Sequence, residues 1–288
     1  MPLRVLVTGA RGQLGSAIAR ILPKRDLISC DRHDIDVRCL EPTKRIVKEA
    51  RAQIVIHCAA FTDVDGCARN PRKAYQVNAV GTRNVALACA DAGAAMVLIS
   101  SNEVFDGTKT KPYEEADHPN PTNTYGISKF AAERHTQQLL NHFYIVRTSW
   151  MYSARGSNFI HRIQKIADEK EPLSVVTDEL GAPTWSEDLA PAILALTKSE
   201  QYGLYHLVNS GHTSRYNLAR MVLDLTGRQG ITIDPIRIED YDRPSTPPKN
   251  GVLANVKGAS IGIKLRPWDE ALREFLQQTV GAAQTTDT

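Results

Sequence analysis

The chain has 288 residues, of which 42% are hydrophobic and 23% charged, which is typical of a globular protein with one large or two coupled domains. Its net charge of +3 is small and its Lys and Arg residues are scattered, so we expect no nucleic-acid partner. It has no run of 18 apolar residues and no signal-peptide pattern at its start, so we expect a cytoplasmic protein with no membrane partner.

The first predicted element is a strand at residues 3–7, followed by a glycine-rich turn and a helix at 16–22. The turn has a spacing typical of dinucleotide-binding proteins: Gly9 makes the tight turn, Gly12 lets backbone approach a pyrophosphate, and Gly15 lets helix pack on strand. The helix N-terminus offers unpaired N–H groups to the phosphates. We therefore predict that a dinucleotide cofactor contacts Gly9, Gly12, Gln13, Leu14 and Gly15.

The second predicted strand, residues 27–30, ends at two residues that favour different cofactors. The Asp31 carboxylate can accept a hydrogen bond from the ribose 2′-hydroxyl of NAD. The Arg32 guanidinium can pair with the 2′-phosphate of NADP. The predicted cofactor is therefore NADPH or NADH, without a preference. Asp36 and Val37 stand where the adenine would lie, although a solvated turn suits them equally well.

Two buried strands and one long helix follow. The apolar run 54–60 predicts a buried parallel strand. Its end would line the cofactor at the sheet edge with Ala59, Ala60 and Phe61. After a helix predicted over 71–92, the strand 96–100 leads to Ser101. That serine lies where open α/β sheets bind ligands, although it would also serve as a strand-end cap.

Tyr125 and Lys129 stand four residues apart at the start of a helix predicted to run to about residue 140. Residues four apart share one face of a helix, so both side chains would point into one pocket. A neighbouring cation favours the ionised form of a phenol and makes it a better acid near neutral pH. The pair therefore indicates proton transfer to a substrate oxygen, although a half-buried Tyr beside a solvated Lys has the same spacing.

Strands that alternate with helices after a glycine turn predict an α/β fold with a Rossmann-type doubly wound parallel sheet. The pattern loosens after residue 149, where a smaller α+β substrate-binding region would begin. The predicted division is a dinucleotide-binding domain at 1–149 with about 186–208, a substrate-binding domain at 150–185 and 209–280, and a tail at 281–288.

Together these motifs resemble the dTDP-4-dehydrorhamnose reductase family of extended short-chain dehydrogenases/reductases. The resemblance extends from Leu3 to about Leu276, and the combination is specific whereas single motifs are not. The motifs are the glycine turn 8–15, 60–65, 77–79, Ser101, 104–107, the Tyr125/Lys129 pair, 147–150, 158–159 and 181–184.

The resemblance implies an oxidoreductase of dTDP-rhamnose biosynthesis. It would transfer hydride from NADPH or NADH to the C4 keto group of a nucleotide sugar, dTDP-6-deoxy-L-lyxo-4-hexulose, giving dTDP-L-rhamnose. Tyr125 would donate the proton, Lys129 would hold the nicotinamide ribose and lower the pKa of Tyr125, and Ser101 would hydrogen-bond the carbonyl. Val64 would line the substrate pocket, and Trp150 would pack on the substrate.

The chain departs from the family pattern directly after Ser101. The family has Asp and Tyr where this chain has Asn102 and Glu103. Because side chains alternate along a strand, at most one of the two should face the sugar. The Asn102 amide can replace a carboxylate as partner of a sugar hydroxyl. We expect Glu103 to turn to solvent or to pair with a base.

No metal site is predicted. Some family members form magnesium-bridged dimers through an acidic residue at the position where this chain has Ala17. The eight histidines and five cysteines also have no metal-ligand spacing. Monomer and homodimer both remain open.

Two alternatives remain beside a reductase. An epimerase or dehydratase of nucleotide sugars shares the fold and the Tyr/Lys pair, and Glu103 would suit a dehydratase. A non-catalytic regulatory subunit of the same fold is disfavoured by Tyr125, Lys129 and Ser101. The sequence leaves open the exact sugar, the nucleotide base, the cofactor preference and the oligomeric state.

Overall fold

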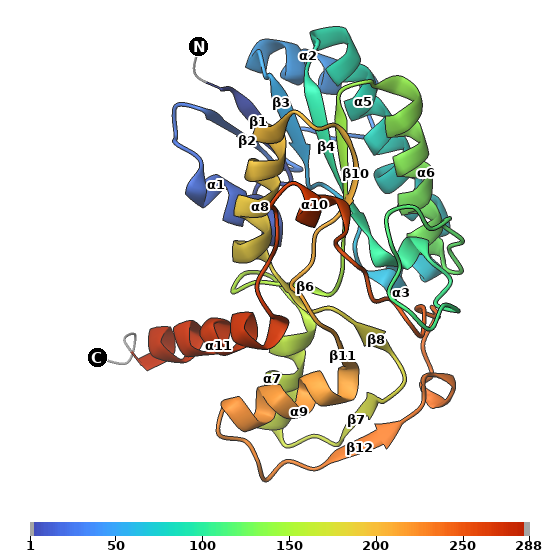
Figure 1. Ribbon diagram of the computed structural model, residues 1–288, viewed down its shortest axis with the longest axis vertical. Coiled ribbons are helices and arrows are strands. Elements are labelled where there is room, and N and C mark those ends of the chain that lie inside the picture. Colours follow the sequence, from blue (N-terminus) through green and yellow to red (C-terminus); the bar gives the residue numbers. More distant parts are fainter. Residues whose placement is uncertain (1–2, 285–288) are drawn as a thin grey trace.

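The protein is built on a parallel sheet, which confirms the predicted Rossmann-type α/β fold (Figure 1). The computed structural model describes residues 3–284. The six parallel strands lie in the order β10-β5-β4-β3-β1-β2, so the chain starts near one edge and crosses back over β1 to form β3. The strands are β1 Val5–Thr8, β2 Leu27–Cys30, β3 Ile54–His57, β4 Ala95–Ser101, β5 Phe143–Thr148 and β10 Gly203–His206.

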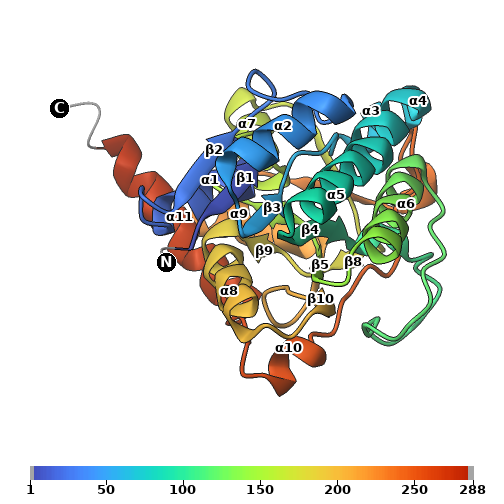
Figure 2. The ribbon, with the colours of Figure 1, turned by 90° about the horizontal axis from the view of Figure 1, so that it is seen from above.

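Helices cover both faces of this sheet (Figure 2). Successive strand side chains point to opposite faces, and most are apolar, so each face needs a cover. One core, which includes Val5 and Val7, is closed by α1 and α8, and the other, which includes Leu6, is closed by α2, α5 and α6. The bounds are α1 Gln13–Ile21, α2 Leu40–Ala50, α3 Val64–Arg69, α6 Thr124–Leu139 and α8 Ser186–Ser199.

The helix predicted before β4 is interrupted by a π-helical segment. Its pieces are α4 Pro71–Ala74, η1 Tyr75–Val80 and α5 Gly81–Ala92. In η1 the Asn78 side chain accepts a hydrogen bond from the Phe61 N–H at 2.7 Å and donates one to Ser128 Oγ at 2.9 Å. Such segments are frequent at functional sites. Here Asn78 of this segment connects the loop after β3 to helix α6.

The later part of the chain forms a smaller group of elements below the sheet in Figure 1. These elements have a core of their own, which includes Trp185, Leu218 and Phe275. The division into two domains stays an interpretation of this arrangement. The elements are β6 Met151–Tyr152, α7 Phe159–Glu169, β7 Leu173–Val176, β8 Leu180–Gly181, β9 Thr184–Trp185, β11 Thr213–Ser214, α9 Arg215–Leu225, β12 Ile233–Ile236, η3 Ile238–Asp240 and α11 Trp268–Gln284. The short helix α10 Lys257–Ser260 lies instead beside β10 of the sheet.

The last helix is longer than the sequence predicted. The predicted tail begins at residue 281, but α11 continues to Gln284. The rest of the predicted tail, residues 285–288, lies outside the described residues.

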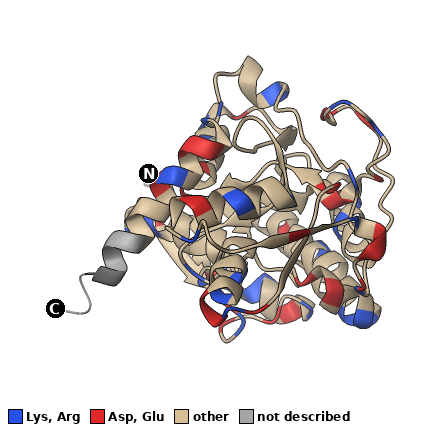
Figure 3. Ribbon diagram, turned by 90° about the horizontal axis from the view of Figure 1, so that it is seen from below, with Lys and Arg blue, Asp and Glu red and all other residues tan. Residues whose placement is uncertain are grey.

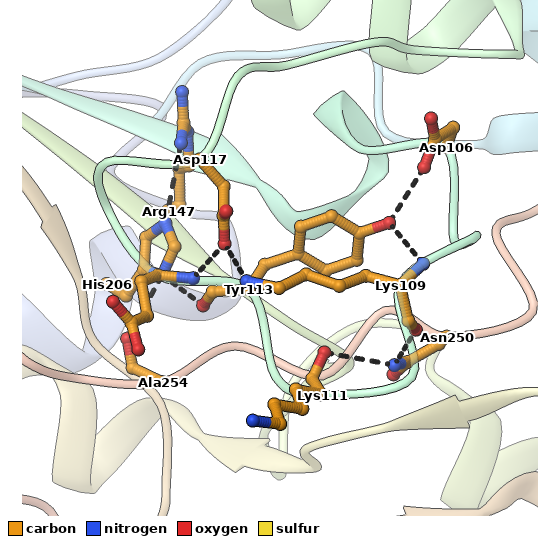
Figure 4. Close-up of polar contacts among 10 residues, drawn as sticks. Asp106, Lys109, Lys111, Tyr113, Asp117, Arg147, His206, Asn250 and Ala254 are labelled. Atoms are coloured by element: carbon orange, nitrogen blue, oxygen red, sulfur yellow. Dashed lines mark hydrogen bonds and ion pairs between the residues drawn. The ribbon is translucent and has the colours of Figure 1, made fainter.

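The loop between β4 and α6 is fixed by polar contacts to distant segments (Figure 4). The Tyr113 hydroxyl donates a hydrogen bond to Asp106 Oδ1 at 2.7 Å, and the Tyr113 carbonyl oxygen lies 3.1 Å from His206 Nδ1. Asn250 Nδ2 donates to the Lys109 carbonyl at 2.6 Å. These contacts attach the loop to β10 and to the segment before α10, and so help to fix where α6 begins.

Charges of both signs are interspersed over the face seen in Figure 3. Positive side chains gather instead inside two of the cavities described below. Within residues 3–284, no helix has the length and apolar character needed to cross a membrane.

Candidate active site

The glycine turn has the geometry that a dinucleotide requires. Gly9 adopts φ +67°, and a Cβ there would lie 2.8 Å from the Ala59 nitrogen, so only glycine fits. A Cβ at Gly15 would overlap the Gly9 carbonyl oxygen, so a side chain there would push α1 away from the turn. At Gly12, by contrast, the nearest atom to a Cβ is the Gly9 oxygen at 3.1 Å, and no side chain caps α1. Gly12 therefore leaves space that a pyrophosphate can occupy at a free helix N-terminus.

A first cavity of about 690 Å³ lies beside this turn. Four cationic side chains line it: Arg11, Arg32, Arg38 and Lys73. The structure also brings predicted cofactor residues together here, namely Gly9, Gly12, Asp31, Arg32, Asp36, Val37, Ala59 and Ala60. The cationic and small apolar walls suit the phosphates and the adenosine of a dinucleotide, so the residues present fit the predicted cofactor.

The negative charge of Asp31 is balanced by Arg11, a residue that the sequence did not single out. Its Oδ2 lies 2.6 Å from Arg11 Nε, and its Oδ1 accepts a hydrogen bond from the His33 N–H at 2.7 Å. The His33 N–H and then the Arg11 charge hold the pKa of Asp31 below its usual value. The cavity wall thus offers the Asp31 carboxylate, which can accept from a ribose hydroxyl, and the exposed Arg32, which can pair with a phosphate.

A second cavity of about 370 Å³ contains the catalytic candidates. Ser101 at the end of β4, and Tyr125 and Lys129 in the first turns of α6, all line it. It also holds other predicted site residues, namely Gln13, Leu14, Gly15, Ala60, Val64, Asn102 and Trp150. Gly12 lines both this cavity and the first, so the two adjoin at the glycine turn.

The position of Tyr125 is set by the first turn of α6. Asn123 caps the helix, since its Oδ1 accepts a hydrogen bond from the Gly126 N–H at 2.9 Å. A Cβ at Gly126 would overlap the Glu103 carbonyl oxygen, so this turn packs directly on the backbone that follows β4. Ser128 Oγ donates to the Tyr125 carbonyl at 2.7 Å. The phenol is therefore held next to the end of β4.

The ionisation of Tyr125 differs from the expectation. Burial raises the pKa of Tyr125 well above its ordinary value, the Glu103 carboxylate adds to this, and the hydrogen bond with Ser101 works against it. Lys129 is itself buried, and burial lowers the pKa of Lys129 to about 8, against the influence of Glu133. The pKa of Tyr125 is therefore raised and not lowered as predicted, and Lys129 is not among the groups that shift it. Tyr125 is a neutral hydroxyl donor at neutral pH.

The expectation for Glu103 is also wrong. The strand ends at Ser101 and a 3₁₀ turn, η2 Asn102–Val104, follows, so the alternation of side chains stops and both Asn102 and Glu103 line the second cavity. The Glu103 residue is only 7% exposed, and its Oε2 accepts a hydrogen bond from Asn123 Nδ2 at 2.6 Å. Burial raises the pKa of Glu103 to about 7.

Trp150 is held in a left-handed backbone conformation, with φ +43°. For a residue other than glycine this costs about 1–3 kcal/mol, so surrounding contacts must hold it. Gly181 lies so close that a Cβ there would overlap the indole, and the Arg215 guanidinium carbon lies 3.6 Å from the ring centroid. Arg215 in turn pairs with Glu179 at 3.0 Å. Arg215 has no signal in the sequence, because only the folded chain brings it to Trp150.

A third cavity of about 320 Å³ shares Ser157, Asn158 and Arg215 with the second. Its cationic side chains are Arg162, Arg215 and Arg243. Arg243 Nε lies 3.0 Å from the Asp65 carboxylate, which connects the loop after η3 to α3. This cationic group also has no signal in the sequence, since its members are far apart along the chain.

One predicted cofactor residue, Phe61, lies outside the first and second cavities. It packs instead against the cluster of Cys67, Ala74 and Tyr125. Lys73 Nζ, which lines the first cavity, lies 4.6 Å from the Phe61 ring centroid. Phe61 thus supports the two sites from behind.

Comparison with known proteins identifies the family. The family model described as the RmlD substrate binding domain matches residues 3–280. The chain belongs to this family. It is 36% identical over 281 residues to the spore coat polysaccharide biosynthesis protein SpsK of Bacillus subtilis, with 97% of this chain and 99% of SpsK covered. It is 33% identical to a dTDP-4-dehydrorhamnose reductase of Mycolicibacterium smegmatis, with 100% and 88% covered.

Solved structures extend the similarity to the fold. The dTDP-4-dehydrorhamnose reductase of Bacillus anthracis, solved in complex with NADP, is 34% identical and has a TM-score of 0.93, with 96% of this chain and 100% of that chain covered. The UDP-glucose 4-epimerase of Thermus thermophilus, solved with NAD, has a TM-score of 0.83 at 21% identity, with 97% and 100% covered. The second similarity shows the fold alone.

Proposed function

We propose that this protein is an NADPH- or NADH-dependent reductase of the C4 keto group of a nucleotide-linked 6-deoxy sugar, converting dTDP-4-dehydrorhamnose to dTDP-L-rhamnose. The observation that supports it most is the placement of Tyr125, Ser101 and Lys129 in a cavity that adjoins the cofactor cavity at Gly12. A hydride donor and a proton donor can therefore reach one carbonyl group from adjacent sites.

In this proposal the bound cofactor supplies the hydride, and the protein supplies the proton and the orientation. The neutral Tyr125 hydroxyl donates its proton to the carbonyl oxygen as negative charge develops there. Ser101 donates a second hydrogen bond to the same oxygen, while its Oγ accepts one from the Glu103 N–H at 3.2 Å. With its pKa lowered to about 8, Lys129 still carries its charge for the most part at pH 7 and can hold the nicotinamide ribose.

The substrate's nucleotide diphosphate would lie in the third cavity. Arg162, Arg215 and Arg243 are the cations there, and guanidinium groups suit phosphate oxygens. Arg215 lines both the second and the third cavity, so one side chain can contact the diphosphate and support Trp150 against the sugar. This arrangement selects a sugar attached to a diphosphate over a free sugar.

The deciding experiment measures net oxidation of NADPH and of NADH with a panel of nucleotide-linked 4-keto sugars, followed by identification of the product. We expect turnover with dTDP-4-dehydrorhamnose and formation of dTDP-L-rhamnose. An epimerase would interconvert sugars without net cofactor oxidation, and a regulatory subunit would bind cofactor without turnover. Either result would overturn the proposal.

Two further measurements test the cellular location and the oligomeric state of the enzyme. We propose a cytoplasmic enzyme, because that compartment supplies both nucleotide sugars and reduced cofactor. Light scattering on the active preparation decides between monomer and homodimer, and cell fractionation that places the protein elsewhere would contradict the proposed location.

A further inference from the structure

Glu103 is a buried acidic group for which the proposed reduction has no use. It follows the carbonyl-binding Ser101 by two residues and lines the same cavity as Tyr125. Asn123 Nδ2 donates a hydrogen bond to its Oε2, and no such bond to its Oε1 is found among residues 3–284. Within the same residues, no Lys, Arg or His nitrogen lies within 4.0 Å of this carboxylate. One oxygen of Glu103 is thus available to a ligand.

A purely structural role explains this arrangement poorly. A buried carboxylate without a paired cation is costly, and an uncharged glutamine would accept the same hydrogen bond from Asn123. At Glu103 this cost is borne beside the two hydroxyl groups that would bind the carbonyl oxygen, Tyr125 and Ser101, which line the same cavity. A carboxylate in such a place is suited to taking a proton from the bound molecule.

The proposed substrate has protons that such a base can remove. The carbons on either side of a C4 keto group, C3 and C5, carry hydrogens that become acidic when the carbonyl oxygen accepts hydrogen bonds. Tyr125 and Ser101 are already placed to donate those bonds for the reduction. Only a base close to the sugar ring is needed in addition, and Glu103 lines that cavity.

We propose that Glu103 is a general base that enolises the bound 4-keto sugar, so that this site exchanges the hydrogen at C3 or C5 with solvent; the proposal rests on the proposed function. The Glu103 carboxylate takes the proton from the carbon, and the C–H electron pair forms a double bond to C4. The carbonyl π pair moves to O4, which Tyr125 and Ser101 stabilise by hydrogen bonds. The Glu103 carboxyl exchanges its proton with water, and return of that solvent-derived proton to the carbon restores the ketone, so no oxidant or reductant is consumed.

The groups around Glu103 set the pH range of this exchange. Glu179 opposes its negative charge, while the hydrogen bond from Asn123 favours it, as do Arg215 from α9 and Arg243 from the loop after η3. Burial outweighs the arginines and raises the pKa of Glu103 to about 7. Since the base is the carboxylate, the exchange rate should rise with pH through about 7 and then level off.

The test uses the enzyme with NADP⁺ and dTDP-4-dehydrorhamnose in D₂O, where reduction cannot occur. NMR and mass spectrometry follow deuterium at C3 and C5 against a sample without enzyme. We expect enzyme-dependent exchange, and we expect Glu103→Gln to lower it by about 10²–10⁴-fold. The same change should lower NADPH oxidation far less, so the ratio of exchange to reduction falls.

Exchange by the wild-type enzyme no faster than in buffer overturns the proposal, even if Glu103→Gln fails to fold. Equal exchange by the wild type and a folded Glu103→Gln also overturns it, as does an equal loss of exchange and reduction. Thermal melting and NADPH binding show whether the variant folds. Exchange is measured without NADPH oxidation, so the two readouts are independent. The absence of reduction with every 4-keto sugar would contradict the proposed function, whatever the exchange experiment shows.

Discussion

Replacing the buried Glu103 by glutamine should change stability in a pH-dependent way. In the folded protein, burial raises the pKa of Glu103 from the ordinary 4.5 to about 7. The unfolded chain releases this proton near pH 4.5, whereas the folded chain keeps it to about pH 7. The folded state therefore binds more protons in this window, and the contribution of Glu103 to stability falls as pH rises.

The size of the effect follows from the same two values. A difference of one in pKa corresponds to about 1.36 kcal/mol, so charged Glu103 lowers the free energy of unfolding by on the order of 3 kcal/mol above pH 7. Below pH 4.5 the group is neutral in both states and this loss is absent. Glutamine keeps an acceptor for Asn123 and removes the ionisation. Glu103→Gln should thus be close to wild type at acid pH and more stable at pH 8.

Urea unfolding at a series of pH values from about 4.5 to 8 measures the difference. Glu49→Gln on α2 is a matched control, because it removes the same charge from an exposed position. We expect the gain in stability of Glu103→Gln over wild type to grow with pH, and that of the control to stay nearly constant. A Glu103→Gln difference that does not depend on pH would refute the assignment of Glu103 as a buried group that titrates near neutrality.

Four further outcomes are expected. Tyr125→Phe should keep the fold and NADPH affinity but lower kcat by about 10²–10⁴-fold, and near wild-type kcat in steady-state assays would contradict its role as proton donor. Gly12→Val should abolish NADPH binding in calorimetry while the chain still folds, because the side chain would fill the space at the helix N-terminus; unchanged affinity would contradict that site. Arg32→Ala should weaken NADPH more than NADH in binding titrations, and an equal loss would show that Arg32 does not contact the 2′-phosphate. Glu133→Ala should lower the free energy of unfolding by about 3–5 kcal/mol, since it leaves the buried Arg147 without its partner at 2.7 Å; a loss near that of a surface substitution would contradict this.

The sequence predicted the features that depend on neighbours along the chain. The strand, glycine turn and helix at the start are local, and so is the spacing that puts Tyr125 and Lys129 on one side of α6. The alternation of strands and helices was sufficient for the parallel sheet. Family resemblance then indicated which side chains to look for around that sheet, although it gave no contacts.

What the sequence could not predict depends on folding over long distances. Arg11 reaches Asp31, and Arg215 reaches Trp150, only because the sheet and the later helices bring them together. The burial of Glu103 follows from a 3₁₀ turn that replaces the expected extended backbone. Burial also reverses the direction of the expected pKa shift of Tyr125, since a spacing of four residues does not show how far the pocket excludes water.

Hydride transfer to C4 is the central claim, and it can be followed directly. The enzyme is supplied with NADPH deuterated at the transferable position of the nicotinamide, together with dTDP-4-dehydrorhamnose, and the product is examined by NMR. We predict that the deuterium appears at C4 of dTDP-L-rhamnose, in step with cofactor oxidation. Cofactor that stays reduced, or a product whose C4 hydrogen comes from solvent, would contradict the account.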